Sequence, residues 1–561
     1  MVTDGAVRAA DNVFAFDHPH SVTPRELAGL LGGKGAGLAE MTSVLGLPVP
    51  PGFTVGLPVC LAYRRDGWPA DLDDALATHV AALEARIGRR LGDPADPLLV
   101  AVRSGAPRSM PGMLDTVLNL GLTDATVDGL SAVSGDAVFA WDSYRRFLAM
   151  YATTVLGVPP DALPAGPAPT DEAGLRGRVA DLKARIAAAG AEVPQDPAAQ
   201  LRGAVEAVFR SWDSPRARTY RAHEGIADDL GTAVNVQAMV FGNRDDRSGT
   251  GVVFTRDPAT GENRAYGDFL PRAQGEDVVA GTARTLTLDD MAARLPAAHR
   301  ELTERLGVLE RHYRDMCDVE FTVESGTLFI LQTRVGKRGA VAAVRLAAEM
   351  AADPAIALTP AEARARLDDT TIERARAEIV AAARQGVAAA ALTRGLGASP
   401  GRVSGAVALD ADAAADAEGP VVLVRPETSP EDVHGMAVSV GILTSTGGLV
   451  SHAAVVARGW GVPAVVGAGE LVVGAADVRD RSGAVLFAAG DSITIDGTTG
   501  EVWRGEIAHD GDPGPTADPT SALTDDEIVA RDLPALAALT AAGGGQPAAR
   551  TSSSMSRANP T

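Results

Sequence analysis

One short stretch constrains the fold most, because it forces an apolar run to turn sharply into a helix. The apolar run 440–443 is followed by Gly447 and Gly448, and then by a helix-favouring segment for which Ser451 is the predicted N-cap. His452 is therefore expected in the first turn of that helix. The positive end of a helix dipole favours a neutral imidazole, and the free amides there can hold phosphate oxygens. A phosphorylatable histidine needs these properties, although an ordinary helix-start histidine, the commoner case, has the same pattern.

The composition limits the class of protein. A chain of 561 residues is too long for one core, and three or four domains are expected. The net charge of -21 argues against a nucleic-acid partner, whereas a small anionic substrate is compatible with local Lys and Arg. Two distant cysteines, Cys60 and Cys317, provide no disulfide framework. No apolar stretch approaches the ~20 residues of a membrane span, so we expect a cytoplasmic protein with no membrane partner.

Two basic residues near the N-terminus are candidates for binding phosphate. Lys34 lies in the glycine-rich stretch 30–38, which is not a Walker A loop but is expected to form a turn that opens onto a helix at 38–44. Backbone amides of such a turn can hold phosphates, and a plain flexible turn is an equally good interpretation. Arg103 stands at the end of a predicted buried strand, where it could meet a phosphate; the pattern alone favours a surface ion pair.

A polar segment between two predicted strands has the composition of a loop that covers phosphates. Residues 234–241 alternate apolar and polar side chains, as a strand with one solvated face does, and 252–255 form the second strand. The loop 243–251 between them combines small residues with many hydrogen-bond donors, as a lid over a triphosphate requires. An ordinary long hairpin turn is the more general interpretation.

Residues 318–334 carry the sharpest chemistry of the N-terminal half. Two strands joined at Ser325 and Gly326 predict a hairpin, and side chains alternate along each strand. Asp318 and Glu320 therefore point the same way, and two carboxylates ~7 Å apart repel each other unless a cation lies near them. Magnesium on a nucleotide phosphate is the natural cation. A solvated strand face with cross-strand ion pairs is the alternative.

Taken together, these segments resemble the pyruvate phosphate dikinase family of phosphoenolpyruvate-utilising enzymes. Residues 447–467 resemble its phosphohistidine motif, and the other segments follow in the family's order over most of 12–506. The resemblance implies a multidomain α/β and α+β fold with an ATP-grasp nucleotide-binding domain and a swivelling phosphohistidine domain. It implies that His452 accepts phosphate and that Asp318 and Glu320 hold Mg2+. The residues it assigns to nucleotide binding are Lys34, Arg103, Gly249, Thr250, Gly251, Gln332 and Arg334.

Three positions depart from the family pattern. Thr446 stands where an arginine usually precedes the glycine pair. Val450 replaces a threonine that a regulatory protein phosphorylates in some dikinases, so that switch is expected to be absent. Pro107 stands where some members carry a second phosphate-binding arginine, and whether the adjacent Arg108 substitutes for it is left open.

The resemblance also predicts the domain boundaries. We expect the nucleotide-binding domain at 1–340, a helical linker at 341–395 and the phosphohistidine domain at 396–508. The remainder, 509–561, is expected to be a disordered low-complexity tail with one short helix at 525–539. Full-length dikinases carry a further (β/α)8 barrel of roughly 250 residues, which we expect to be absent from this chain.

The resemblance implies the first half of a dikinase cycle. ATP and orthophosphate would phosphorylate His452, giving AMP and pyrophosphate, and pyruvate would receive the phosphoryl group on a separate barrel-containing protein. Alternatives are a phosphotransferase with a different acceptor, such as the rifamycin-phosphorylating relatives, a non-catalytic relic, and a gene-level truncation. A homodimer is one assembly that the sequence leaves open.

Overall fold

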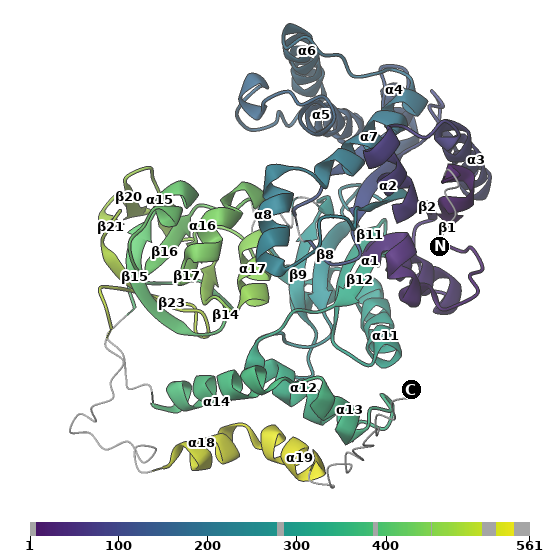
Figure 1. Ribbon diagram of the computed structural model, residues 1–561. Helices are drawn as coiled ribbons and strands as arrows, with labels where there is room; N and C mark the ends of the chain where they lie inside the picture. The colour runs from purple at the N-terminus through teal and green to yellow at the C-terminus, as the bar shows by residue number, and fades with distance from the viewer. Residues whose placement is uncertain are drawn as a thin grey trace, which may run out of the picture. The chain divides into compact units, whose positions relative to one another are not determined.

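The computed structural model describes residues 7–543 except 111, 276, 278–284, 385–390, 450 and 508–522. The chain divides into two compact units (Figure 1). We call residues 1–259, 263–339 and 387–509 the large unit, and residues 260–262, 340–386 and 510–561 the helical unit. The predicted multidomain α/β organisation is confirmed, whereas the predicted domain boundaries stay a prediction. Among the described residues, no helix has the length and apolar character needed to cross a membrane.

The first sheet of the large unit has the strand order β1-β2-β7-β5-β6. Its strands are β1 (Val13–Ala15), β2 (Gly52–Val55), β5 (Val100–Gly105), β6 (Thr116–Leu120) and β7 (Ala233–Ala238), and a separate short pair is β3 (Arg90–Leu91) and β4 (Pro97–Leu98). The helices of this part are α1 (Ala28–Ala39), α2 (Leu57–Asp66), α3 (Leu72–Ile87), α4 (Val127–Ser134), α5 (Ala137–Thr154), α6 (Glu172–Ala188), α7 (Pro197–Ser211) and α8 (Pro215–Glu224). A π-helical turn, Glu40–Val44, continues α1.

The central strand β7 corrects one prediction, because neither of its faces is solvated. All six of its residues are buried, and α1, α2 and α7 pack against it. Its polar side chains bond to protein groups: Thr54 Oγ1 donates to Asn235 Oδ1 at 2.8 Å, and Gln237 Nε2 donates to the carbonyl oxygen of Pro50 at 3.2 Å, while Asn235 Nδ2 is buried without a partner. A polar and apolar alternation cannot distinguish such an internal network from contact with water.

The second sheet has the order β10-β9-β8-β11-β12, all antiparallel. Its elements are β8 (Gly249–Phe254), β9 (Tyr266–Pro271), β10 (Leu286–Thr287), β11 (Cys317–Glu324) and β12 (Thr327–Val335), with helices α10 (Leu288–Arg294) and α11 (Pro296–Tyr313). The predicted hairpin is confirmed. Ser325 and Gly326, at the turn, have φ of 49° and 88°, as a type I′ turn requires.

The third sheet carries the histidine helix. Its order is β13-β23-β22-β15-β16-β17-β18-β14, and β15 to β18 run parallel. Its strands are β13 (Thr393–Arg394), β14 (Leu396–Ser399), β15 (Arg402–Ala408), β16 (Val421–Arg425), β17 (Gly441–Thr444), β18 (Ala464–Val466), β22 (Ser492–Asp496) and β23 (Glu501–Arg504). The same part of the chain contains a separate small sheet of β19 (Leu471–Val473), β20 (Asp477–Asp480) and β21 (Val485–Ala488). Its helices are α15 (Ala411–Ala415), α16 (Val433–Val438) and α17 (His452–Trp460).

The helical unit corrects the interpretation of the C-terminal segment. It contains α12 (Ala340–Ala352), α13 (Pro360–Ala365) and α14 (Asp369–Arg384), together with α18 (Asp525–Asp532) and α19 (Pro534–Gly543). One helix was expected at 525–539, but Pro534 begins a second helix, and apolar side chains of both helices, including Ile528 of α18 and Leu539 of α19, are buried. The α18 and α19 helices pack on α12, α13 and α14. The rest of the expected tail, 508–522 and 544–561, lies outside the described residues.

Candidate functional site

Lys34 lies inside helix α1, so the predicted glycine-rich turn is wrong except at Gly32. Only Gly32 leaves helical geometry, with φ of 68°, and a Cβ there would overlap the carbonyl oxygen of Gly105 at 1.7 Å. A Cβ at Gly35 would lie 2.8 Å from Thr54 Oγ1. The glycines therefore serve close packing: they let α1 lie directly on the first sheet. This contact fixes the lysine side chain beside β5.

The ammonium group of Lys34 is available for a ligand. It has no hydrogen-bond or ion-pair partner in the part of the chain that the structure describes. Burial, together with Arg103 and Arg334, lowers the pKa of Lys34 to about 7, while Glu320 opposes the shift. A cation that has no hydrogen-bonded counterion in a low-dielectric site attracts an incoming anion strongly.

Arg103 of β5 reaches across to Glu320 of β11. The Arg103 guanidinium donates to Glu320 Oε2 at 2.5 Å, and both side chains are mostly shielded from solvent. Burial alone would raise the pKa of Glu320, but Arg103, Lys34 and Arg334 lower it to about 2. The carboxylate is therefore ionised at neutral pH and surrounded by cations.

The β11–β12 hairpin places the other predicted ligands on one face. Asp318 is paired with Arg334 and Glu320 with Gln332 in the strand register, and Arg334 Nε donates to Asp318 Oδ2 at 2.6 Å. Asp318 Oδ1 and Gln332 Oε1 are buried without a hydrogen-bond partner. Such orphaned oxygen atoms fit Mg2+, which takes oxygen ligands. Among the described residues, no group of three or more His, Cys, Asp or Glu is arranged to hold a metal alone.

The segment Gly249, Thr250 and Gly251 is a buried strand, and the prediction that it belongs to a loop is wrong. It forms the start of β8, paired with β9 and β11. A Cβ at Gly249 would lie 2.3 Å from the ring of Phe269, and one at Gly251 would lie 2.6 Å from the ring of Phe321. The two rings stack with their centroids 6.4 Å apart, so the glycines make room for them. The segment still borders the site, because Thr250 and Gly251 line the pocket described next.

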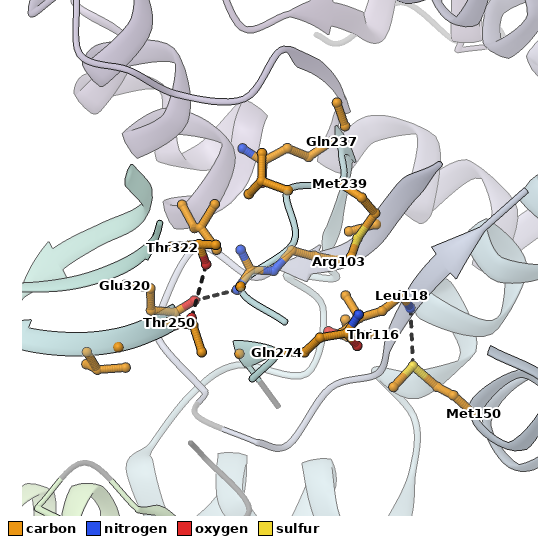
Figure 2. A pocket seen from close by; sticks show the side chains of 18 residues that line it. Arg103, Thr116, Leu118, Met150, Gln237, Met239, Thr250, Gln274, Glu320 and Thr322 are labelled. Carbon is orange, nitrogen blue, oxygen red and sulfur yellow. Dashed lines mark hydrogen bonds and ion pairs between the residues drawn. The ribbon is translucent and has the colours of Figure 1, made fainter. Parts of the chain in front are cut away.

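A mostly apolar pocket of about 260 Å³ opens beside the Arg103–Glu320 pair (Figure 2). Its wall comes from β5 and β6, from the C-terminal end of β7, and from β8, β11 and β12. Figure 2 shows Arg103 pointing across this pocket toward Glu320. Gln237, Met239 and Gln274 also line it, and no sequence pattern predicts that these residues belong to a site. The only signal for Gln237 was a polar residue within a strand, which has many other causes.

His452 occupies the first position of α17, as predicted, and is almost fully buried. Its Nδ1 lies 3.0 Å from Thr428 Oγ1, whereas its Nε2 is buried without a partner. Burial lowers the pKa of His452 to about 4, against the opposing charges of Asp432 and Glu431, so the ring is neutral at neutral pH. Ser451 has the predicted N-cap backbone geometry, but its hydroxyl makes no capping bond.

The histidine and the basic residues line one cavity of about 540 Å³, which also borders the Arg103–Glu320 pair. Lys34, Arg334 and His452 all contribute to its wall. The loop before β6 brings Gly112 against the imidazole: a Cβ built on Gly112 would lie 3.2 Å from His452 Cδ2 and 3.7 Å from Nε2. The unpartnered imidazole nitrogen therefore lies at the same cavity as the predicted phosphate ligands, although these residues lie hundreds of positions apart in the sequence.

Helix α17 packs against the first part of the chain through its C-terminal end. Trp460 Nε1 donates to Glu224 Oε1 of α8 at 2.6 Å, and the Trp460 ring contacts His223 at 4.5 Å between centroids. In Figure 1 α17 and α8 lie next to each other. Arg216 of α8 also pairs with Glu431, at 2.9 Å. These contacts hold His452 at the cavity.

The positions that depart from the family pattern have different surroundings. Thr446 Oγ1 donates to the carbonyl oxygen of Pro426 at 2.9 Å, a contact within the histidine-bearing part of the chain. Val450 lies outside the described residues. Pro107 and Arg108 line the cavity that contains His452, so the shifted arginine still faces the site.

Comparison with known proteins gives consistent matches. Residues 65–294 match the family described as pyruvate phosphate dikinase, AMP/ATP-binding domain, and residues 417–500 match the mobile domain of PEP-utilising enzymes. The chain is 47% identical over 511 residues to pyruvate, phosphate dikinase of Rhizobium meliloti (strain 1021), and 44% identical over 505 residues to that of Clostridium symbiosum. Each of these alignments covers 85% of the chain and 56% of the relative. The chloroplastic enzyme of Flaveria trinervia is 45% identical over 531 residues, with coverages of 90% and 54%. The chain thus spans about half the length of the curated relatives it matches.

Proposed function

Because this chain belongs to the pyruvate, phosphate dikinase family and carries its AMP/ATP-binding and mobile domains, we propose that it transfers a phosphoryl group from ATP to His452. The proposal includes orthophosphate as cosubstrate, with AMP and pyrophosphate as products. Pyruvate is proposed as the final acceptor, which would yield phosphoenolpyruvate. The observation that carries the proposal is the unpartnered Nε2 of His452 at a cavity lined by Lys34 and Arg334.

We propose that the nucleotide lies along the two connected cavities. The apolar pocket shown in Figure 2 suits a nucleobase, since such sites are mainly apolar with a few polar groups, here including Gln237 and Gln274. Lys34 and Arg103 would then bind the phosphates where the two cavities meet. An incoming triphosphate would raise the pKa of Lys34 and compete with Glu320 for Arg103.

Magnesium is proposed to bind on the face shared by β11 and β12. Asp318 Oδ1, Gln332 Oε1 and a Glu320 oxygen are the donors that this chain supplies, and phosphate oxygens would complete the ligand set. When bound, the ion would neutralise charge that develops on the phosphates during transfer. Arg334 donates to Asp318 Oδ2 and so holds that carboxylate, which leaves Oδ1 without a hydrogen-bond partner.

His452 is proposed to act through Nε2. We propose the tautomer in which Nδ1–H donates to Thr428 Oγ1, 3.0 Å away, so that the lone pair lies on the unpartnered Nε2. The Nε2–Pβ bond forms, the Pβ–O bond to the α-phosphate breaks, and AMP leaves with that oxygen. An oxygen of orthophosphate then bonds to Pγ, the Pγ–O bond breaks with the oxygen remaining on Pβ, and pyrophosphate leaves. The attacking phosphate releases its proton to solvent, and phosphohistidine remains.

The second half of the cycle requires the histidine to leave the cavity. We propose that the domain at 396–508 detaches from the nucleotide-binding domain at 1–340 and carries phosphohistidine to the acceptor, with 341–395 as the connecting segment. The contacts to be broken include the polar pairs Arg216–Glu431 and Trp460–Glu224 and an apolar cluster in which Val433 packs with residues such as Met113 and Tyr220. Interfaces between domains of one chain resemble transient protein–protein interfaces, so relative motion of the two domains is the expected behaviour.

Labelling tests the proposal directly. The full chain is incubated with Mg2+, orthophosphate and ATP labelled at the β-phosphate, and acid-labile label on the protein is counted. We expect label on the wild-type chain and on the control variant His434→Ala. His434 is a histidine of α16 whose side chain is exposed. His452→Ala is expected to carry none. An unlabelled wild-type chain would support the non-catalytic alternative, and label that survives His452→Ala would move the acceptor to another residue.

A further inference from the structure

A buried carboxylate just after α1 has no role in the scheme above. Glu40 begins the π-helical turn that continues α1, and its side chain is fully shielded from solvent. Glu40 Oε1 lies 2.6 Å from His312 Nε2 of α11, and the backbone amide of Arg25 donates to Glu40 Oε2 at 3.3 Å. Both oxygen atoms of this carboxylate therefore contact segments of the chain other than α1.

Such a pair is a poor device for stability alone. Moving a carboxylate out of water is costly, and replacing a buried polar or charged pair by apolar residues is often neutral or stabilising. In some proteins buried polar pairs are kept because they fix one arrangement of the chain. A π-helical turn is rare, and such turns occur frequently at functional sites. Both features meet at Glu40, which indicates a role in arranging the site nearby.

The pair joins the two parts of the chain that supply the phosphate site. Helix α1, which carries Lys34, packs on the first sheet through its glycines. Helix α11 packs on the second sheet and leads into β11, the strand of the proposed metal ligands. Its last turn is anchored there, because Arg256 Nε, just beyond β8, donates to Glu310 Oε1 at 3.0 Å. His312 lies two residues after Glu310, so its contact with Glu40 ties α1 to the second sheet.

A hydrogen bond fixes this junction more sharply than the apolar packing beside it. Leu38 and Met41 belong to the same apolar cluster as Leu309 of α11. Apolar contacts are non-directional and tolerate small shifts, whereas a hydrogen bond depends on distance and angle. Lys34 lies about 9 Å along the helix axis from Glu40 by the helical rise, so a shift at Glu40 also moves the lysine. A misplacement of about 1 Å at a reactive site can reduce a rate about 100-fold.

We infer that Glu40 and His312 are positioning residues, which hold Lys34 where the phosphates of ATP bind. The inference rests on the proposed function, because it explains how one of the proposed nucleotide ligands is placed. Neither Glu40 nor His312 is among the described residues that line the two cavities. They therefore act through the position of α1 and not by contact with the nucleotide.

Binding measurements test the inference without turnover. All chains carry His452→Ala, and their affinities for Mg2+-ATP and for adenosine are measured by calorimetry. His312→Leu is expected to weaken ATP binding about tenfold or more, since a hydrogen bond between Lys34 and a phosphate contributes roughly 10- to 150-fold to affinity. Adenosine has no phosphate, and its affinity is expected to stay within about twofold. His312→Gln keeps a donor near the position of Nε2 and is expected to recover most of the affinity for ATP.

Further variants separate positioning from stability. The double variant Glu40→Leu/His312→Leu leaves no charge buried without its partner, so its melting temperature is expected to return close to that of the wild type, while its affinity for ATP stays low. Adding His312→Leu to Lys34→Met is expected to weaken ATP binding by less than about a further twofold, because the lysine is already lost. The matched control is His434→Leu, which removes the exposed contact of 2.9 Å with Asp412 and is expected to bind ATP as the wild type does.

Three results would overturn the inference. A double leucine variant that binds ATP as tightly as the wild type would show that the pair only stabilises the fold. Full additivity of His312→Leu with Lys34→Met would show that the pair does not act through the lysine, and equal losses for ATP and adenosine would point to general disruption. The proposed function fails separately, if the chain with His452 intact takes up no label from β-labelled ATP, and the affinities still decide the inference in that case.

Discussion

Replacing Thr428 by valine tests whether a single hydrogen bond sets the reactivity of His452. Thr428 Oγ1 lies 3.0 Å from Nδ1, and both residues are buried. Valine keeps nearly the same shape but removes the acceptor, so the buried Nδ1–H loses its partner. In the neutral ring this bond is worth about 0.5–1.5 kcal/mol, and after attack, when the ring carries positive charge, about 1.5–3 kcal/mol. The difference, about 1–2 kcal/mol, predicts a rate of histidine phosphorylation lower by a factor of about 5–30.

The assay is a single turnover with β-labelled ATP in excess, stopped by rapid quenching, with the rate of label appearance on the protein as the readout. Thr428→Ser keeps the hydroxyl and is expected to retain most of the rate, while the affinity for ATP is expected to be equal in all three chains. A valine variant as fast as wild type would refute the reasoning. A serine variant as slow as the valine variant would show that the methyl group, and not the hydrogen bond, matters.

Other predictions concern protons and packing at the same cavity. Because burial lowers the pKa of His452 to about 4, the rate of labelling should show no inflection near pH 6.5 and should fall only as pH approaches that lower value. The pKa of Lys34 is about 7 without nucleotide, and a bound anion raises it, so ATP binding at pH 7.5 should be accompanied by uptake of a proton. Calorimetry in buffers of different ionisation enthalpy measures this uptake, and Lys34→Met should abolish it. Gly112→Ala adds a Cβ 3.2 Å from the imidazole at φ of +74°, a conformation that costs other residues about 1–2 kcal/mol, so labelling should slow while ATP binding persists. Glu320→Gln removes the charge that pairs with Arg103, and Mg2+-dependent labelling should fall at least about tenfold.

The parts of the fold that the sequence predicted well are those with a strong local pattern. The hairpin at Ser325 and Gly326 follows from period-two alternation on both sides of a two-residue turn, and no distant contact can change it easily. The position of His452 at a helix start follows in the same way from the glycines before it. Even there the local rule described only the backbone: Ser451 adopts the N-cap conformation, but its hydroxyl makes no capping bond.

The predictions that were wrong concern elements whose exposed face is covered by a segment distant in the sequence, which a local pattern does not reveal. The alternation around Asn235 suggested water on one side, but helices of the large unit cover β7 and internal bonds replace the solvent. The segment 525–539 was read as a single helix beside disordered sequence, because its alanine-rich surroundings hide the apolar residues that pack on α12 to α14. In both cases burial by tertiary contacts overrides the expectation from composition.

The glycines show why the candidate site could be recognised but not assembled from the sequence. The glycines around Lys34 and in the stretch 249–251 predicted mobile loops over phosphate. In the structure these glycines instead allow close packing, of α1 on the first sheet and of β8 on the stacked rings of Phe269 and Phe321. Rigid packing serves binding better than mobility would, because it fixes Lys34 and Arg103 before the ligand arrives and lowers the entropy lost on binding. Each cation alone had an ordinary explanation, as a turn lysine or a surface arginine. Their combined role depends on the tertiary fold. The strands β5 and β11 belong to different sheets, which must approach each other for Arg103 to reach Glu320, and α17 must pack near α8 for His452 to line the same cavity.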